Sequence, residues 1–174
     1  QNGVICNPNI PSEEVFTTPH NLRVEGHVSS TKPLSHQGSL IDEIRVEFKE
    51  GAIVDAKASK GEKIFKKVLE SDDGARRLGE VALVPDSSPI SQSGLLFYNT
   101  LFDENAACHI ALGQCYSKCF KSKQNLSQEE IKSRGGNSSM IHIDWMIGSK
   151  EIDIDGLSEN GEITPVFRKG EWCV

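Results

Sequence analysis

Apolar and polar residues alternate along a stretch in the first third of the chain. Residues 39–58 keep this alternation on both sides of Lys49-Glu50-Gly51, a sequence typical of a tight turn. Alternation with a period of two places apolar side chains on one face of a β-strand. We therefore expect a β-hairpin over residues 39–58.

In the next segments, the apolar residues no longer alternate with polar ones. From Gly61 to Leu69, apolar residues recur at spacings of one, three and four, which predicts an amphipathic helix. Residues 78–85 hold a short apolar run that a proline stops, which predicts a buried strand. Residues 103–115 begin with acidic residues suited to a helix N-terminus and continue with alanines and aliphatic residues, so we expect a second helix that Gly113 can end early.

The last third of the chain is predicted to form short helices and strands. Ser127 followed by Glu130 is a capping-box pattern and predicts a short helix that stops at Gly135-Gly136. Residues 139–147 read as a strand, and two turn signals, at 160–161 and 169–170, predict hairpins. Strands at both ends with helices between them predict an α+β fold with mixed or antiparallel sheets and a few helices, in a single domain.

Length and composition narrow the class of protein. The 174 residues are enough for one domain with its own core, and the 37% hydrophobic and 25% charged residues are ordinary for a soluble protein. No apolar run approaches the roughly 20 residues of a membrane span. The 25 acidic residues outnumber the 19 basic ones, for a net charge of -6. We therefore expect neither nucleic acid nor a membrane as a partner.

Five scattered cysteines, an odd number, do not suggest a disulfide framework. A reducing compartment fits them best, and we expect the protein to be cytoplasmic. Cys108, Cys115 and Cys119, beside His109, could instead form a small zinc site. Six and three residues separate these cysteines, and the lack of a second cluster argues against such a site.

His142 and Asp144 occupy alternate positions of the predicted strand 139–147. They must therefore face the same side, about 7 Å apart. An imidazole and a carboxylate placed in this way can converge on one zinc-like ion. The alternative is an ordinary half-exposed strand.

His109 lies on the predicted helix 103–115, and Tyr116 follows seven residues later, about two turns along the same face if the helix persists. A lone helical histidine is more often a partly buried structural residue than a metal ligand. The neighbouring Asp103 and Glu104 could simply cap the helix and complement its dipole.

Three further carboxylates are placed where they could reach a metal. Glu80 precedes a buried apolar run, an awkward place for a charge unless Arg76, Arg77 or a metal ion compensates it. Glu13 and Glu14 adjoin on an extended segment and point to opposite sides, so that one could bind a metal while the other reaches a water. Both could instead be solvated acids.

Five of these residues supply two imidazoles and three carboxylates, a suitable number for a two-metal site with open positions: Glu14, Glu80, His109, His142 and Asp144. Their spacing alone does not show that they converge. Neither a Gly-x-Ser-x-Gly elbow nor a phosphate-binding P-loop is present in the sequence, which disfavours serine hydrolases and P-loop enzymes.

Four segments carry a resemblance to a known family: residues 9–19, 77–85, 101–113 and 142–148. In this order they resemble the C-terminal part of the aminopeptidase T and aminopeptidase S family of metallo-aminopeptidases. The similarity covers essentially the whole chain. We therefore expect residues 1–174 to be the C-terminal metal-binding catalytic domain, without the upstream N-terminal domain of the family.

The resemblance also implies what the site does. It implies two divalent ions per chain (zinc, cobalt or magnesium), peptide substrates and a homodimer. The metal ligands that it implies are Glu14, Glu80, His109, His142 and Asp144, with Tyr116 at the site.

We therefore expect a metallo-aminopeptidase that releases N-terminal residues by two-metal hydrolysis. Glu13 is the expected general base, and Tyr116 a metal ligand or a donor to the oxyanion. Two alternatives stay open. One is a two-metal phosphoesterase, which should also place basic residues near the ligands, and the other is a non-catalytic binding module.

Overall fold

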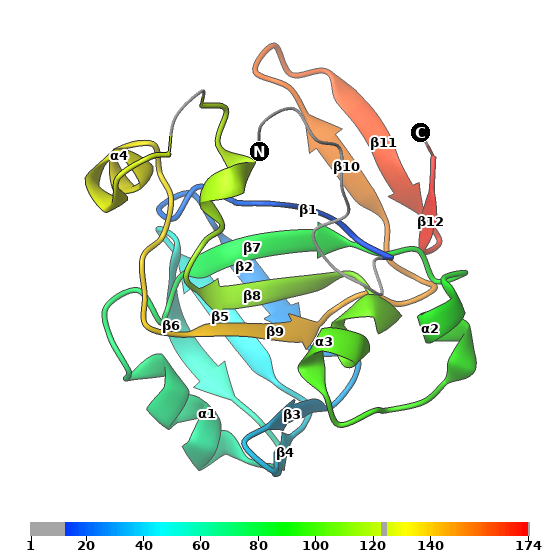
Figure 1. Ribbon diagram of the computed structural model, residues 1–174. Helices are drawn as coiled ribbons and strands as arrows, with labels where there is room; N and C mark the ends of the chain where they lie inside the picture. The colour runs from blue at the N-terminus through cyan, green and yellow to red at the C-terminus, as the bar shows by residue number, and fades with distance from the viewer. Residues whose placement is uncertain (1–12, 123–124, 174) are drawn as a thin grey trace.

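A four-stranded antiparallel sheet forms the middle of the molecule (Figure 1). The structure, a computed structural model, describes residues 13–122 and 125–173. The strands of this central sheet lie in the order β1 (Val15–Thr17), β7 (Leu78–Leu83), β8 (His109–Gly113) and β9 (His142–Met146). The strands predicted over 78–85 and 139–147 are therefore confirmed, each with tighter ends.

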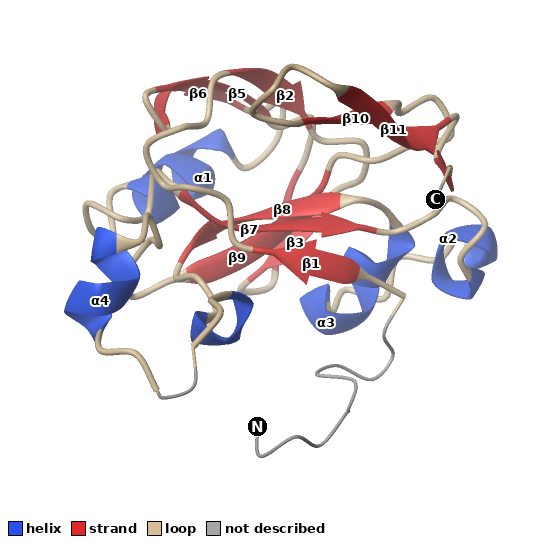
Figure 2. Ribbon diagram, turned by 90° about the horizontal axis from the view of Figure 1, so that it is seen from above, coloured by secondary structure: helices blue, strands red, loops and turns tan. Residues whose placement is uncertain are grey.

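A second antiparallel sheet lies on one side of the central sheet, and helix α3 lies on the other (Figure 2). Its strands are β2 (Gly26–Ser29), β5 (Arg45–Lys49) and β6 (Ala52–Lys57). The expected hairpin is thus confirmed from Arg45 onward, with its turn at Glu50 and Gly51 in the left-handed region. The residues before it pair separately, as the ribbon of β3 (Leu34–His36) and β4 (Ser39–Ile41).

The main core fills the space between these two sheets and α1 (Glu62–Leu69). Helix α1 follows the predicted amphipathic pattern, because Phe65, Val68 and Leu69 are buried while Lys66 faces out and pairs with Glu62 at 2.6 Å. The central sheet contributes Leu78, Ile110, Leu112, Ile143 and Trp145 to the same core. One face of the central sheet is therefore apolar and covered.

The remaining helices are short. They are α2 (Pro89–Ser93), α3 (Thr100–Asp103), the 3-10 turns η1 (Glu104–Ala106) and η2 (Ser117–Cys119), and α4 (Gln128–Ser133). Helix α4 begins with the predicted capping box of Ser127 and Glu130. Among the described residues, no helix has the length and apolar character needed to cross a bilayer.

The C-terminal part of the chain forms a small sheet of three strands: β10 (Ile154–Leu157), β11 (Ile163–Arg168) and β12 (Glu171–Trp172). Both predicted hairpins are present here, because β10 pairs with β11 and β11 with β12. Every strand pair among the described residues is antiparallel. The predicted α+β class with a few helices and a single domain is confirmed.

The helix predicted over residues 103–115 is wrong. Helical structure ends with η1, because Ala107 is fully extended, and the chain continues as strand β8. All five residues of β8 are buried between β7 and β9. A strand buried on both faces shows a continuous apolar run, which a short stretch of helix also shows.

Asn137 links the loop after α4 to the central sheet. Its side-chain amide donates to the carbonyls of Gly74 and Gly113, at 2.8 and 2.7 Å, and is 3.3 Å from the carbonyl of Arg77. The residue is only 3% exposed. These bonds hold the loop against the strand ends where β7 begins and β8 stops.

Candidate metal centre

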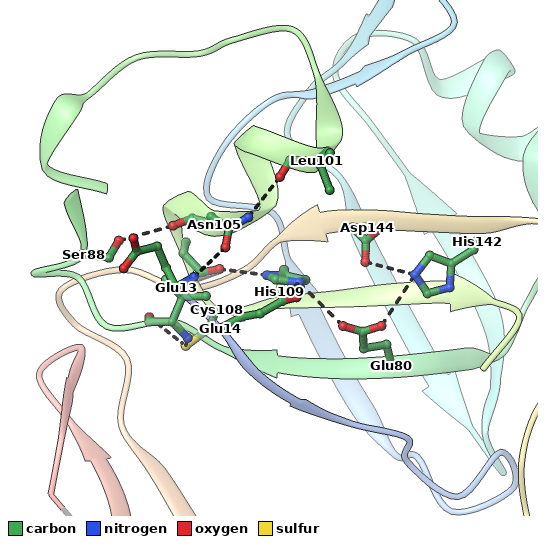
Figure 3. A network of polar contacts seen from close by, with 12 residues as sticks. Glu13, Glu14, Glu80, Ser88, Leu101, Asn105, Cys108, His109, His142 and Asp144 are labelled. Atoms are coloured by element: carbon green, nitrogen blue, oxygen red, sulfur yellow. Dashed lines mark hydrogen bonds and ion pairs between the residues drawn. The ribbon is translucent and has the colours of Figure 1, made fainter. Parts of the chain in front are cut away.

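The face of the central sheet that points away from the apolar core carries the predicted site residues (Figure 3). His109 lies on β8, and His142 and Asp144 lie at alternate positions of β9, as the sequence pattern required. His109 therefore projects from a strand and not from the predicted helix. Glu14 immediately precedes β1, the edge strand beside β7.

A β-bulge turns Glu80 toward this face. In β7, Leu78 pairs with Leu112 and Glu80 pairs with Ala111, so one extra residue, Gly79, is inserted between them. Without it, Leu78 and Glu80 would share a face, because residues two apart point the same way. A Cβ on Gly79 would lie 2.4 Å from the Gln114 carbonyl oxygen, so the bulge has room only for glycine.

The side chains converge within ion-pair distance. His109 Nε2 is 3.0 Å from Glu14 Oε2 and 3.9 Å from Glu80 Oε1. His142 Nε2 is 3.6 Å from Glu80 Oε2 and 3.5 Å from Asp144 Oδ1. The sequence-predicted ligands Glu14, Glu80, His109, His142 and Asp144 therefore form one cluster.

A backbone carbonyl orients each histidine ring through Nδ1, the nitrogen that faces away from the cluster. The Nδ1 atoms of His109 and His142 lie 3.1 and 2.7 Å from the carbonyl oxygens of Ala107 and Gln114. A carbonyl oxygen only accepts, so each Nδ1 carries a proton and donates it. In the neutral imidazole the Nε2 lone pair then points into the cluster, which is how a metal-binding histidine is held.

The potential ligand atoms fall into overlapping groups of three residues. Glu14, Glu80 and His109 form one group with all atoms within 4.8 Å, and Glu80, His142 and Asp144 form another. Glu80 belongs to both, as a bridging carboxylate does in a two-metal site. Its Oε2 is also buried and makes no hydrogen bond with the described residues. The donor set of carboxylates and imidazoles suits zinc-like ions.

The buried carboxylates are crowded. Burial and the charge of Asp144 raise the pKa of Glu80 to about 7 and that of Glu104 to about 8. A buried carboxyl group resists ionisation unless a cation lies beside it. The cluster therefore favours the binding of positive charge.

The histidines show the same excess of negative charge. Burial disfavours the charged form of His109, but the hydrogen bond to Glu14 and the charge of Asp144 outweigh it and raise the pKa to about 9. Burial acts likewise on His142, where Asp144 outweighs it and the pKa is again about 9. Protons and metal ions thus compete for the same atoms.

A cavity of about 190 Å³ opens over the cluster. Phe16 and Tyr116 form its aromatic side, with ring centroids 5.7 Å apart, and Tyr116 also contacts His142 at 4.9 Å. Burial and nearby carboxylates raise the pKa of Tyr116 to about 12, so the phenol keeps its proton at neutral pH. The cavity is smaller than the ~300–1,000 Å³ typical of drug-sized ligands and suits one end of an extended molecule.

Other predicted interactions at the site are not found. Arg76 and Arg77 donate to backbone carbonyls instead of pairing with Glu80. The backbone N–H of Glu13 donates to Asn105 Oδ1 at 2.9 Å, and among the described residues Glu13 is neither in a ligand group nor part of the cavity lining.

The cysteine alternative also receives no support. Four of the cysteines are free thiols, and Cys6 lies outside the described residues. Within the described residues, no group of potential metal ligands includes a cysteine.

Sequence reasoning treated Glu104 as a helix cap and so missed its place at the site. Its side chain forms a third group with His109 and Asp144, and it lines the cavity. It is 7% exposed. The neighbouring Asp103 holds the loop before α3, since it accepts the backbone N–H groups of Phe97 and Asn99, while Asn99 caps the helix. Two adjacent acids with one local role between them are the signal that could have found Glu104.

Comparisons with known proteins agree on one family. The family of thermophilic metalloproteases (M29) matches residues 1–172. Aminopeptidase T of Thermus aquaticus is 53% identical over 172 residues, and aminopeptidase 2 of Geobacillus stearothermophilus is 54% identical over 173 residues. The solved structure of wild-type AmpT from Thermus thermophilus covers all of this chain with a TM-score of 0.91 and 51% identity.

The chain spans less than half of these relatives. It covers 42% of the length of each of the two aminopeptidases and 43% of the AmpT chain, although 99–100% of its own residues are matched.

Proposed function

Because the chain belongs to the M29 family of thermophilic metalloproteases, we propose that it carries the metal centre of an aminopeptidase. The proposed reaction is the release of N-terminal residues from peptides by two-metal-assisted hydrolysis. The observation that carries this proposal is the pair of ligand groups that share Glu80. Relatives that carry the name aminopeptidase add support, at 52–54% identity.

In this proposal each side chain has a defined task. Glu14 and His109 would hold one ion, His142 and Asp144 would hold the other, and Glu80 would contribute to both sets. When bound, the divalent ions supply Lewis-acid polarisation of the peptide carbonyl and activation of water at neutral pH. The carbonyls of Ala107 and Gln114 keep the histidine rings aligned.

Tyr116 is proposed as a hydrogen-bond donor to the oxyanion. Its ring lies against His142 and lines the cavity, and its phenol is protonated at neutral pH. Tyr116→Phe should lower kcat by about 10²-fold or more, in the range reported for loss of an oxyanion donor. Unchanged turnover with both metals bound would exclude this role and ligation by Tyr116.

We propose Glu13 as the general base, on the basis of its position in the sequence. It adjoins the ligand Glu14, and its backbone is fixed by Asn105. Glu13→Gln with retained metal should lower kcat by about 10²–10⁴-fold if the role is right. Normal kcat in this variant would assign the base to another group.

The cavity chemistry favours a peptidase over a phosphoesterase. Among the described residues, the cavity lining holds four carboxylates and a single lysine, Lys118. A phosphate would meet mainly negative charge there, whereas a peptide N-terminus brings a positive charge.

The decisive experiment measures bound metal and turnover together. We would dialyse the chain against zinc, cobalt or magnesium, determine metal per chain by elemental analysis, and assay an aminoacyl chromogenic amide and a phosphoester. We expect about two ions per chain, lost in Glu80→Gln and His142→Ala. Phosphoester turnover alone would favour the phosphoesterase, and no specific metal would contradict the proposal and favour a binding module.

The identity of the ions, a homodimer and a cytoplasmic location stay predictions. The expected domain assignment does too, because the chain spans only part of its relatives. Mass measurement of the native chain with and without metal tests the dimer directly.

A further inference from the structure

A lysine lines the cavity over the metal cluster, next to the acidic side chains. Within the described residues, the lining holds no arginine, a single lysine, Lys118, and four carboxylates: Glu14, Glu80, Glu104 and Asp144. Lys118 is exposed, and its side chain forms no ion pair or hydrogen bond with another residue that the structure describes. Its ammonium group is therefore available to a ligand that carries a negative charge.

The turn that carries Lys118 sets it beside the cluster. Lys118 lies in η2, which follows Tyr116 directly, and the Cys119 N–H donates to the Tyr116 carbonyl at 3.1 Å. The Tyr116 ring in turn lies against the proposed ligand His142, with ring centroids 4.9 Å apart. The backbone thus fixes the start of the lysine side chain, while its flexible four-carbon stem lets the ammonium group meet a ligand.

The adjoining hollow offers no such positive charge. It shares Asp144 with the first cavity and adds the apolar side chains of Leu101 and Ile143. Among the described residues, its lining includes neither lysine nor arginine. Burial lowers the pKa of its histidine, His36, below 6.5, so that this ring is neutral at pH 7. The two hollows beside the cluster therefore differ, and a protein cation for a ligand carboxylate stands on the side of Lys118.

We propose that Lys118 binds the free C-terminal carboxylate of a dipeptide whose peptide bond lies over the metal cluster. This inference rests on the proposed aminopeptidase function and names a substrate class for it. In a dipeptide, the carboxylate lies one residue beyond the cleaved carbonyl, roughly 3.3–3.6 Å along an extended chain. Both groups therefore fit within one small cavity of about 190 Å³. In a longer peptide, the same position holds an uncharged amide.

Charge places the ligand carboxylate away from the metal ligands. A negative group is repelled beside the four carboxylates of the lining, because juxtaposed like charges are costly. One residue further along the peptide, Lys118 provides the opposite charge. An exposed ion pair of this kind adds only about two- to fivefold in affinity. Lys118 therefore adjusts the choice between substrates and is not needed to bind the ions.

The test uses two ligands that differ only at the carboxylate. They are leucyl-alanine and leucyl-alaninamide, each with the carbonyl of the peptide bond reduced to a methylene group, so that neither is hydrolysed. Their affinities for the zinc-loaded chain are measured by calorimetry. We expect the wild-type chain to bind the carboxylate form about two- to fivefold more tightly than the amide.

Three variants complete the design. Lys118→Met removes the charge but keeps an apolar stem, and should abolish the preference without changing the affinity for the amide. Lys118→Glu should reverse the preference, because it brings two negative charges together. Lys63→Met is the matched control, since Lys63 is exposed on α1 outside the cavity lining, and its preference should equal that of wild type. Circular dichroism and zinc content show whether each variant is folded and loaded.

Several results would overturn the assignment. Equal affinities of the two ligands for wild type, or an unchanged preference in Lys118→Met, would show that Lys118 does not bind the carboxylate. Equal weakening of both ligands in Lys118→Met would make Lys118 a contact of the peptide backbone. A third ligand, the reduced leucyl-aspartamide, carries its carboxylate on the side chain. If Lys118 strengthens the binding of this ligand alone, the lysine selects acidic side chains and not dipeptides.

Failure of the proposed function has a different signature. If the wild-type chain binds no zinc, the metal centre itself is wrong, and the role of Lys118 fails with it. If zinc binds and only the preference for the carboxylate is missing, the metal centre stands and the role of Lys118 alone is excluded.

Discussion

The two faces of the central sheet carry opposite chemistry on the same three strands. Toward the second sheet, β7, β8 and β9 present only core residues: Leu78, Ile110, Leu112, Ile143 and Trp145. Toward the cavity they present the charged cluster: Glu80, His109, His142 and Asp144. Burial of the first set stabilises the fold, whereas burial of the second opposes folding until a cation compensates it. The apolar face thus supports a face that is suited to binding.

The largest effect on stability should come from the apolar face. Trp145 is fully buried and packs edge-on against Phe65, with ring centroids 6.3 Å apart. Trp145→Ala should lower the free energy of unfolding by about 3–5 kcal/mol, measured by urea denaturation. Trp145→Phe should cost less, because the indole N–H makes no hydrogen bond with the described residues. Equal costs would show that the indole packs differently.

The charged face should become stabilising only when metal is present. At a free metal concentration of 1,000 times Kd, one bound ion should raise the free energy of unfolding by about 4 kcal/mol. Glu80→Gln should lose this gain, because Glu80 is shared by both ligand groups. Thermal melts with zinc and with a chelator provide the measurement. A similar gain in the variant would mean that the ion binds elsewhere.

Without metal, the same substitution should have the opposite sign. The pKa of Glu80 is about 7 in the folded chain, above its usual value of 4.5, so the folded state binds this proton more tightly. Its stabilising contribution is complete at low pH and is lost as the pH rises through 7. At pH 8, Glu80→Gln should therefore be more stable than wild type by about 1–3 kcal/mol. At pH 5 the difference should shrink, and a destabilised variant at pH 8 would contradict the account.

The smallest effect on stability should come from a residue outside both faces, Asp72, which binds the segment just before β9. Asp72 accepts the N–H groups of Gly74 and Met140 and the hydroxyl of Ser139. Burial opposes its charge, but these hydrogen bonds outweigh burial and lower its pKa below 3.8. Asp72→Asn should cost only about 1 kcal/mol at pH 7, since the group is partly exposed and its interactions are screened by solvent.

That cost should depend on pH in a defined direction. Because the pKa of Asp72 is lower in the folded state, its ionised form stabilises the fold at a pH above the ordinary pKa of an aspartate. This stabilisation is lost as the pH falls through the lowered pKa. Urea denaturation at pH 7 and pH 3 should therefore show a smaller difference between wild type and Asp72→Asn at pH 3. The same difference at both pH values would mean that the charge of Asp72 is irrelevant.

Local signals in the sequence predicted most of the fold. The capping box at Ser127 and the apolar face of α1 each depend on a few neighbouring residues, and helices α4 and α1 formed where expected. The alternation in β9 also placed His142 and Asp144 on one face. Such signals succeed because the pattern and the structure share the same few residues.

The errors arose where distant contacts decide the structure. Residues 109–113 form a strand because β7 and β9 enclose them, and neither neighbour is adjacent in sequence. Glu80 was expected at the site, but the bulge at Gly79 that turns it toward the cluster was not, because it shows in the sequence only as a glycine. Glu104 was overlooked because helix capping was a sufficient explanation in the sequence for both Asp103 and Glu104. Convergence of side chains from five segments is a property of the fold and cannot be read from spacing.

The buried amide of Asn137 has a consequence for how the protein can be produced. Asn137-Ser-Ser and Asn125-Leu-Ser both match the acceptor triplet for N-linked sugars. The nitrogen that would carry the sugar at Asn137 is already bonded to two carbonyls inside the fold. A chain secreted from a eukaryotic host should therefore carry glycans at Asn125 alone once folded, while sugar added to Asn137 before folding would block the loop from closing on β8.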